Sequence, residues 1–315
     1  MHLPLLILDL FSAYGGTGWV DAGWSCAARR RGHKIVTLEI EKLFKPDLCG
    51  DILEITIAEI IEACGGRMPD IIYASPPCEG FSVTVIGRNW GNWTPEFKKL
   101  AQGHIERGEQ TPAEIAPTPR TDSARHGLTL LRRTLEIIFE FKKLNPNLFW
   151  WLENPRGMMR YQPELSAISR VTVTHGSYHD PAASHFGLPG DAHVGMPEGH
   201  LPPCKPTDLW GDFPGTWTPR PYLQKKFGGI LYMKAPRGSR TGIQGMDGSA
   251  KSPSGEKIGA YWVRSLIPFY LGWDTITAVE RELGVEAPID YIFHTDATRT
   301  KSEIGFEKWF GDDDE

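Results

Sequence analysis

Residues 70–78 read DIIYASPPC, an apolar run that ends in two prolines and a cysteine. The run predicts a buried strand, and Pro76 and Pro77 end it because proline has no amide hydrogen for sheet pairing. Cys78 is therefore expected at the rim of a sheet, where open α/β sheets bind their ligands. Taken alone, the residue is explained equally well as a catalytic thiol or as an ordinary buried cysteine.

Strand and helix patterns alternate on both sides of this run, which is the order of a doubly wound α/β sheet. We expect strands at 5–11, 34–39, 70–74, 147–152 and 171–174, and helices at 18–31, 55–64, 123–144 and 261–282. The first of these strands lacks the basic leader and cleavage site of a signal peptide. Residues 79–122 are rich in Gly, Pro and Trp and have little periodicity, which predicts a long, mobile active-site loop.

Composition is that of a soluble globular protein, with 315 residues, 40% hydrophobic and 23% charged. The net charge is −5, but residues 218–264 hold nine Lys/Arg against two acids, whereas 274–315 hold four against twelve. This asymmetry favours an anionic partner on one face, or else a solvated surface. Five scattered cysteines suit a reducing compartment and exclude a disulfide framework or a CxxC zinc site. We expect a catalytic domain at 1–185, a loop-rich module at 186–260 and a returning segment with an acidic tail at 261–315.

A glycine-rich turn follows the first predicted strand, in DLFSAYGGTG at 9–18. Such turns let backbone amides approach a ligand at the start of a helix. Glu39 ends the next strand, where an acid commonly binds a ribose, and Asp51 is suited to an adenine amine. A ligand that has a ribose, an adenine and a carboxylate but no pyrophosphate would be S-adenosylmethionine. A purely structural turn explains the stretch about as well.

A second polar cluster, Glu153-Asn154-Pro155, also follows a predicted buried strand. A parallel sheet can bring Glu153 to the same rim as Cys78. A thiolate beside a carboxyl group could attack a heteroaromatic ring that the carboxyl protonates. The alternative is that Glu153 caps a helix or a turn.

Three motifs, residues 9–16, SPPCEGFS at 75–82 and Glu153-Asn154-Pro155, resemble signature motifs of the DNA cytosine-5 methyltransferases in order and spacing. The resemblance covers about 5–178 and, more weakly, 261–272. KPTDLW at 205–210 is similar to a string in compact phage-type members. The resemblance implies a Rossmann-like methyltransferase sheet with a small loop-rich target-recognition module.

For the reaction, the resemblance implies that a flipped cytosine is attacked at carbon 6 by Cys78. Glu153 would bind ring nitrogen 3 and the exocyclic amine, Asn154 would fix the loop, and the loop after Cys78 would close over the base. The residues implied for the S-adenosylmethionine site and its pocket are Phe11, Ser12, Ala13, Gly15, Gly16, Glu39, Asp51, Ile52 and Pro76. Those implied for DNA contacts are Lys225, Lys226, Lys234, Arg237 and Arg240.

The chain departs from the family in two motifs. Ala13 stands where a glycine is usual, and no Gln-x-Arg-x-Arg motif is recognisable, so that Arg156 or a cation near Lys205 is a candidate substitute. The partner implied is double-stranded DNA and not a membrane. The protein is expected to be a monomer in the cytoplasm of a bacterial or phage-infected cell, with or without a cognate restriction nuclease in the same host. A tRNA cytosine methyltransferase and a catalytically silent DNA-binding protein remain the rivals. The target sequence, and whether the donor is a modified S-adenosylmethionine, cannot be read from these residues.

Overall fold

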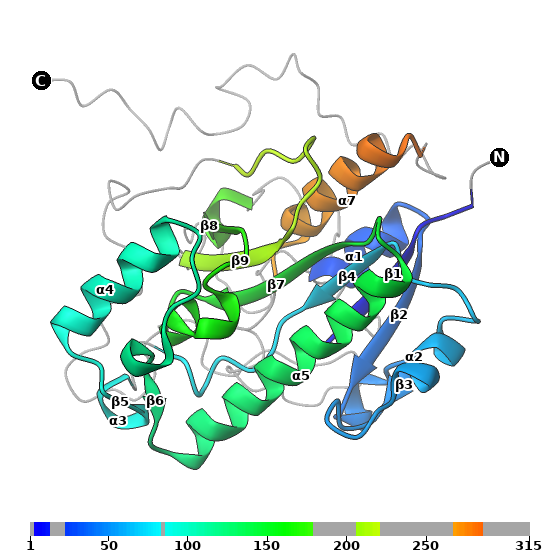
Figure 1. Ribbon diagram of the computed structural model, residues 1–315. Coiled ribbons are helices and arrows are strands. Elements are labelled where there is room, and N and C mark those ends of the chain that lie inside the picture. Colours follow the sequence, from blue (N-terminus) through cyan, green and yellow to red (C-terminus); the bar gives the residue numbers. More distant parts are fainter. Residues whose placement is uncertain (1–2, 13–22, 83–85, 179–205, 221–266, 286–315) are drawn as a thin grey trace, which may run out of the picture.

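A seven-stranded sheet in the order β3-β2-β1-β4-β7-β9-β8 forms the centre of the protein (Figure 1). The computed structural model describes residues 3–12, 23–82, 86–178, 206–220 and 267–285. The strands of the sheet are β1 (Leu6–Leu10), β2 (Lys34–Glu39), β3 (Leu48–Cys49), β4 (Ile71–Ala74), β7 (Phe149–Pro155), β8 (Arg170–Thr174) and β9 (Pro206–Asp212). The prediction of an α/β fold built on a mostly parallel sheet is confirmed.

Strand direction decides which residues meet at the functional edge of this sheet. Strands β3, β2, β1, β4 and β7 pair in parallel, whereas β9 is antiparallel to both of its neighbours, β7 and β8. Since β8 is reversed twice relative to β7, it runs in the same direction as β7. The ends of β1, β2, β4, β7 and β8 therefore lie along one edge, which we call the carboxyl edge.

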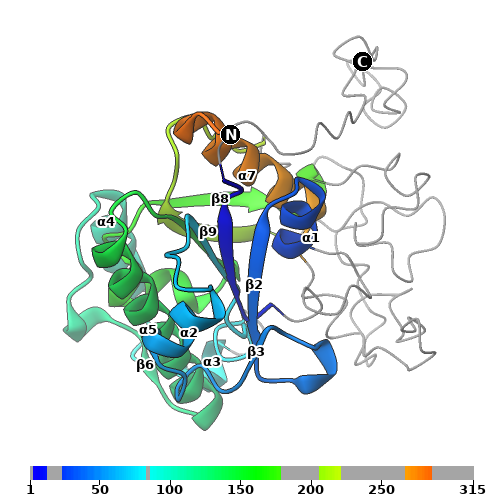
Figure 2. The same cartoon turned by 90° about the vertical axis from the view of Figure 1, so that its right-hand side faces the viewer.

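Helices cover both faces of the sheet. The long helices of the described ranges are α1 (Gly23–Arg30), α2 (Ile57–Ala63), α4 (Pro95–Glu106), α5 (Asp122–Leu144) and α7 (Phe269–Leu283). Figure 2 shows α2 and α5 on one side of the strands and α1 and α7 on the other. Within these ranges, no helix combines the length and the apolar character needed to cross a bilayer.

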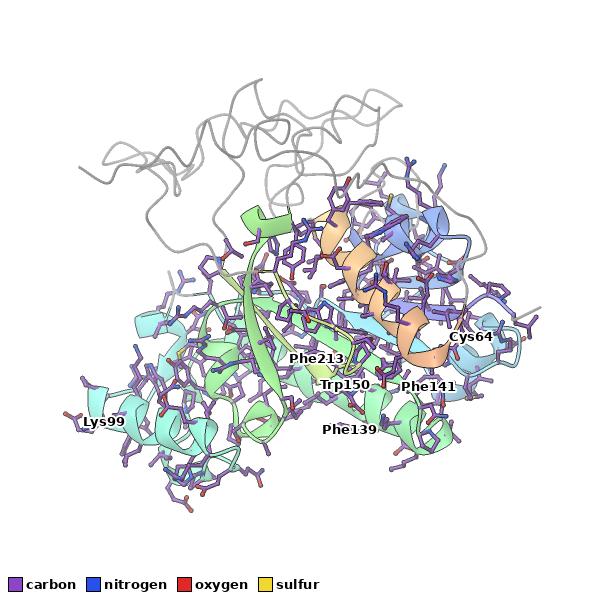
Figure 3. All side chains as sticks on the ribbon, turned by 90° about the horizontal axis from the view of Figure 1, so that it is seen from above. Cys64, Lys99, Phe139, Phe141, Trp150 and Phe213 are labelled. Carbon is purple, nitrogen blue, oxygen red and sulfur yellow. The ribbon has the colours of Figure 1, made fainter. Side chains whose placement is uncertain are left out.

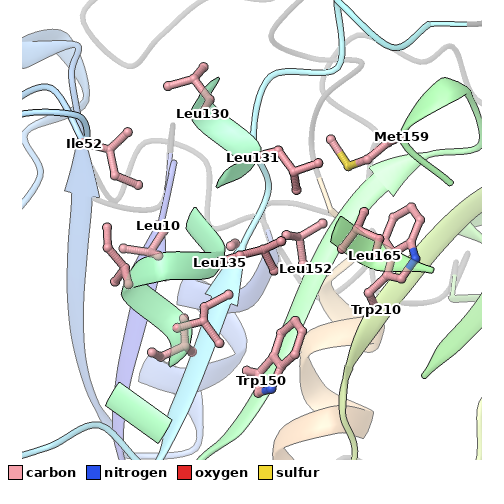
Figure 4. Packing of buried hydrophobic residues seen from close by; sticks show 14 of the residues in the cluster. Leu10, Ile52, Leu130, Leu131, Leu135, Trp150, Leu152, Met159, Leu165 and Trp210 are labelled. Carbon is pink, nitrogen blue, oxygen red and sulfur yellow. The ribbon is translucent and has the colours of Figure 1, made fainter. Parts of the chain in front are cut away.

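The alternation of side chains along each strand produces two separate cores. Leu8 and Leu10 of β1 belong to the core on the α5 side, whereas Ile7 belongs to the core on the α1–α7 side. In Figure 4, Leu135 of α5 lies next to Leu152 of β7. Because both faces are covered, the parallel strands are mostly apolar, as the sequence pattern predicted.

Aromatic side chains of the helices pack against aromatic side chains of the strands on both faces of the sheet. Phe139 of α5 is 43% exposed, yet its ring stands edge-on to the buried Trp150 with centroids 6.1 Å apart (Figure 3). On the other face, Trp24 of α1 stacks on Tyr73 of β4 at 4.1 Å. Each such aromatic pair contributes about 0.5–1.5 kcal/mol to stability beyond the contribution of the apolar area that it buries.

Helix α7 is fixed to the first half of the chain by buried polar contacts. Glu280 pairs with Arg31, and its Oε1 lies 2.7 Å from His33 Nε2. Near the middle of the helix, the hydroxyls of Thr275 and Tyr73 are 2.8 Å apart. These contacts explain how a helix near the C-terminal end of the chain packs beside α1.

The prediction of an irregular loop over 79–122 was wrong for most of its length. The segment contains α3 (Ile86–Asn89), α4, and a two-stranded sheet of β5 (Trp90–Gly91) and β6 (Thr118–Pro119) (Figure 1). The start of α4 carries a recognisable signal: Thr94 Oγ1 accepts from the amide of Phe97, and Pro95 occupies the first turn. The number of glycines, prolines and tryptophans around it concealed this signal.

The described part of the predicted 186–260 module is the segment 206–220, and it begins with β9. This strand pairs with β7 and β8 and is thus an integral part of the central sheet. We expected a separate, loop-rich module there, because the range is rich in Gly and Pro and has few helix signals. The proposed division of the chain at 186 and 260 stays a prediction, since the rest of that range lies outside the described residues.

Candidate active site

Cys78 and Glu153 lie at the carboxyl edge on neighbouring strands. Strands β4 and β7 pair in parallel, with Ala74 opposite Leu152. Glu153 is the next residue of β7 and is 3% exposed, whereas Cys78 follows β4 after the two prolines and is partly exposed. A buried carboxyl group and an accessible thiol are thus positioned by adjacent strands, which is the arrangement that the sequence predicted.

A hydrogen bond between side chain and backbone joins the two motifs. Asn154 Nδ2 donates to the carbonyl oxygen of Pro76 at 2.9 Å, and Asn154 is 1% exposed. A buried bond of this kind contributes about 1 kcal/mol and also restricts the geometry of both segments. It holds the Pro-Pro-Cys segment close in space to the strand that carries Glu153.

The turn that follows Cys78 is also held from several sides. The carbonyl oxygen of Gly80 accepts from Trp90 Nε1 at 2.7 Å and from Asn89 Nδ2 at 3.2 Å. The carbonyl oxygen of Phe81 accepts from the amide of Met158 at 2.8 Å. At Gly157 a Cβ would collide with this same carbonyl oxygen, so only glycine allows the approach. Residues 78–82 thus form a rigid platform rather than the start of a loose loop.

A set of polar groups gathers at the ends of β1 and β2. The amide of Ser12 donates to the carbonyl oxygen of Leu38, and the amide of Gly50 donates to that of Glu39, so that 12, 39 and 51 are neighbours. Glu39 Oε1 accepts from the amide of Ile40 at 2.8 Å. Within the described part of the chain, the buried Ser12 Oγ has no hydrogen-bond partner. This set can accept and donate hydrogen bonds to a ligand that carries hydroxyls and an amine.

The other residues predicted for this site fall into two groups. Phe11 has a φ of 62°, a left-handed conformation that turns the chain sharply after β1. Ile52 is 3% exposed, and Asp51 Oδ1 accepts from the amide of Leu53 at 2.9 Å. The predicted residues that lie outside the described ranges are Ala13, Gly15, Gly16, Lys225, Lys226, Lys234, Arg237 and Arg240.

Asp9, at the end of β1, is a buried acid that the sequence analysis did not select as a site residue. Burial raises the pKa of Asp9 from 3.8 to about 7, although a 2.5 Å hydrogen bond from Ser25 Oγ favours the charged form. The folded state therefore holds a proton that the unfolded chain has lost. This contribution to stability is complete below pH 3.8 and disappears as the pH rises through about 7.

We expect Asp9→Asn to become relatively more stable than the wild type as the pH rises. The amide keeps the acceptor for Ser25 but carries no charge, so its burial costs the same at every pH. Between pH 5 and pH 8 the difference in unfolding free energy should change by roughly 2–3 kcal/mol in favour of the variant. Urea denaturation at the two pH values measures it, and a difference that does not change with pH would contradict the assignment.

A buried ion pair supports the segment after Glu153. Arg160 donates from Nε and Nη2 to the carboxylate of Asp208 on β9, at 2.9 and 2.6 Å, and Thr172 Oγ1 of β8 donates to the same carboxylate at 2.7 Å. The side chains of Arg160 and Asp208 are 8% and 0% exposed. The sequence analysis missed this pair because its formation depends on β9 entering the sheet.

Asp208→Asn is expected to lower the unfolding free energy by about 3–5 kcal/mol, because it leaves a guanidinium group buried without its counter-charge. The double variant Arg160→Met/Asp208→Asn should recover part of this loss, since it removes both charges. Chemical denaturation of the three proteins measures both effects. A single-variant loss below about 1 kcal/mol would show that the pair is not a support of the site.

The role considered for Arg156 stays a prediction. Its side chain is exposed, and its backbone amide donates to the carbonyl oxygen of Pro206 at 2.9 Å. Lys205, the other candidate substitute, lies outside the described residues. Among the described residues, a basic group that lies beside Glu153 is His175, whose Nε2 is 3.8 Å from Glu153 Oε1. His175 follows a predicted strand, as Cys78 and Glu153 do, and the same rule would have found it.

Comparison with known proteins places these motifs in context. No family model matches the sequence. The chain is 34% identical over 149 residues to a probable DNA (cytosine-5)-methyltransferase of Frog virus 3, a match that covers 47% of this chain and 53% of the relative. A solved structure of the Entamoeba histolytica methyltransferase EhMeth aligns with a TM-score of 0.32 and 12% identity over 71% of this chain and 58% of that one. The chain thus spans about half the length of this curated relative. The match to this relative confirms that the chain resembles DNA cytosine-5 methyltransferases.

Proposed function

We propose that this protein is a DNA cytosine-5 methyltransferase that uses Cys78 as its nucleophile. The observation that carries the proposal is the hydrogen bond from Asn154 to the carbonyl of Pro76, because it ties together the two segments that carry the thiol of Cys78 and the buried carboxyl group of Glu153. The Frog virus 3 relative, named a probable DNA (cytosine-5)-methyltransferase, supports the choice of DNA as substrate.

The proposed chemistry begins at carbon 6 of a cytosine that has left the base stack. The thiolate of Cys78 forms a bond to carbon 6, and the electrons of the 5,6 double bond make carbon 5 nucleophilic. Glu153 protonates ring nitrogen 3 and accepts a hydrogen bond from the exocyclic amine, which stabilises this adduct and discriminates against thymine. Carbon 5 then takes a methyl group. A water molecule accepts the proton of carbon 5, which restores the 5,6 double bond and expels the thiolate of Cys78, and ring nitrogen 3 returns its proton to Glu153.

The residues at the ends of β1 and β2 fit S-adenosylmethionine as the methyl donor. A carboxylate at Glu39 suits ribose hydroxyls, Asp51 suits an adenine amine, and Ser12 supplies a buried hydroxyl that has no partner in the described ranges. When bound, this cofactor would supply an activated methyl group. The chain's own part is to bind the nucleoside end of the cofactor at this location.

The test measures transfer of label from methyl-labelled S-adenosylmethionine to purified nucleic acids. A duplex DNA pool of random sequence is compared with the same pool lacking cytosine and with total tRNA. We expect label only in cytosine-containing DNA. Label in tRNA alone would support the tRNA methyltransferase, and label in none of the samples would support a silent binding protein.

A further inference from the structure

The contact between His175 and Glu153 is buried and is formed by two strands that are not neighbours. His175 Nε2 lies 3.8 Å from Glu153 Oε1, and the side chains are only 4% and 5% exposed. His175 directly follows β8, and β9 separates β8 from β7 in the sheet. Such a distance is longer than a hydrogen bond but short enough for a strong charge interaction in a buried site.

Side-chain alternation explains why the two groups meet. Trp151 of β7 and Val173 of β8 both belong to the core on the α1–α7 side of the sheet. Glu153 and His175 are each two residues further along their strands, so they point to this same side. Both strands also end at the carboxyl edge. The imidazole therefore reaches the carboxyl group across the beginning of β9.

The turn that carries His175 is anchored and not adjustable. Tyr178, in the same 3-10 turn (His175–Tyr178), is fully buried, and its hydroxyl accepts from the amide of Arg220 at 3.0 Å. Arg220 in turn pairs with Asp274 of α7 at 2.7 Å. Anchoring of this turn at Tyr178 restricts the backbone position of His175 relative to Glu153.

The other ionisable groups on the surrounding elements are largely engaged elsewhere. Arg160 and Asp208 pair with each other beside β9, and Arg220 pairs with Asp274. Asp212, at the end of β9, pairs with Lys142, and other ionisable groups on these elements include Cys78 after β4, the exposed Arg156 after β7 and Arg170 at the far end of β8. Glu153 and His175 face each other from the ends of β7 and β8, with His175 Nε2 3.8 Å from Glu153 Oε1.

We propose that His175 is a positioning residue: its imidazolium form orients Glu153 through Oε1 and stabilises the carboxylate that is left when Glu153 protonates ring nitrogen 3. This inference rests on the proposed function and deepens it. The imidazole touches neither the base nor the cofactor in this role; it acts through Glu153. Its charge makes the protonation step depend on pH in the range where histidine titrates.

The test compares pH profiles of kcat and KM for the wild type and His175→Gln. Glutamine places a neutral nitrogen donor near the position of Nε2, so it keeps the shape but removes the charge. We expect kcat near pH 6.5 to fall roughly 10- to 100-fold with little change in KM, and the wild-type decline of kcat above neutral pH to disappear. A variant whose profile runs parallel to that of the wild type would overturn the proposal.

His33→Gln is the matched control. His33 is also a buried histidine that contacts a glutamate, Glu280, but it lies before β2 at the opposite edge of the sheet. We expect its replacement to lower stability and to leave the pH profile of kcat unchanged. The same change of profile in both variants would show that the effect is structural, and it would overturn the proposal.

A measurement that does not depend on methyl transfer separates this inference from the proposed function. Hydrogen–deuterium exchange at the imidazole C2 position reports the titration of His175 in the intact protein. In Glu153→Gln the midpoint should move to lower pH, because the carboxylate that stabilises the imidazolium is gone. An unchanged midpoint overturns the inference even if DNA is methylated. A moved midpoint without any methylation supports the contact and refutes the proposed function.

Discussion

Cys78→Ser is expected to lower methyl transfer to DNA by at least about 10³-fold, the largest effect of any substitution that we predict. A serine hydroxyl is not ionised at neutral pH, so carbon 6 loses its nucleophile and carbon 5 is never activated. Binding of DNA and cofactor should change little, because the side chain differs by one atom. Single-turnover transfer of labelled methyl measures the effect.

Two other cysteines provide the controls for this substitution. Burial raises the pKa of Cys64 to about 11, so this residue stays a neutral thiol at the pH of the assay. Cys49 is exposed on β3, and Cys49→Ser should leave transfer within about twofold of the wild type. If Cys78→Ser keeps most of its activity, Cys78 is not the nucleophile.

Glu153→Gln is expected to reduce kcat/KM by roughly 10²- to 10⁴-fold, the range of a lost general acid. The amide has the same shape and can still hydrogen bond to the base, but it cannot give a proton to ring nitrogen 3. The adduct of Cys78 with carbon 6 would then carry an uncompensated negative charge. Rapid-quench measurement of adduct formation should show that this step, rather than DNA binding, is slow.

The control for Glu153→Gln is Glu164→Gln. Glu164 is in the same part of the chain, and its carboxylate pairs with the exposed Arg132 at 2.7 Å. Exposed pairs contribute less than about 1 kcal/mol, so we expect near-normal activity. A similar loss in both variants would mean that the segment after β7 has been disturbed and that the acid role of Glu153 is unsupported.

The parallel half of the fold could be predicted because its strands are continuous apolar runs that end in polar residues. Lys34–Glu39 has the predicted bounds, and Ile71–Ala74 differs from its prediction by one residue. Strand β9 could not be predicted in this way. Its aspartate looks incompatible with a buried strand until Arg160 supplies the counter-charge, and that residue lies 48 positions away.

The candidate site was predicted to the extent that its residues follow strands. The positions of Cys78 and Glu153 at the carboxyl edge come from that rule alone. The sequence did not show in which direction β8 runs. The two antiparallel pairings of β9 bring the end of β8, and with it His175, to the same edge as Cys78 and Glu153. Asp9 was missed for another reason, because its raised pKa depends on burial under α1.

The most direct test of the central claim is a search for a covalent bond between Cys78 and DNA. A duplex pool in which cytosine is replaced by 5-fluorocytosine is incubated with the protein and S-adenosylmethionine. Fluorine at carbon 5 cannot leave as a proton does, so the sulfur cannot be expelled and the adduct persists. We expect peptide mass spectrometry to find the nucleotide on Cys78 alone. Methylation of ordinary DNA without this adduct, or an adduct on another cysteine, would contradict the account.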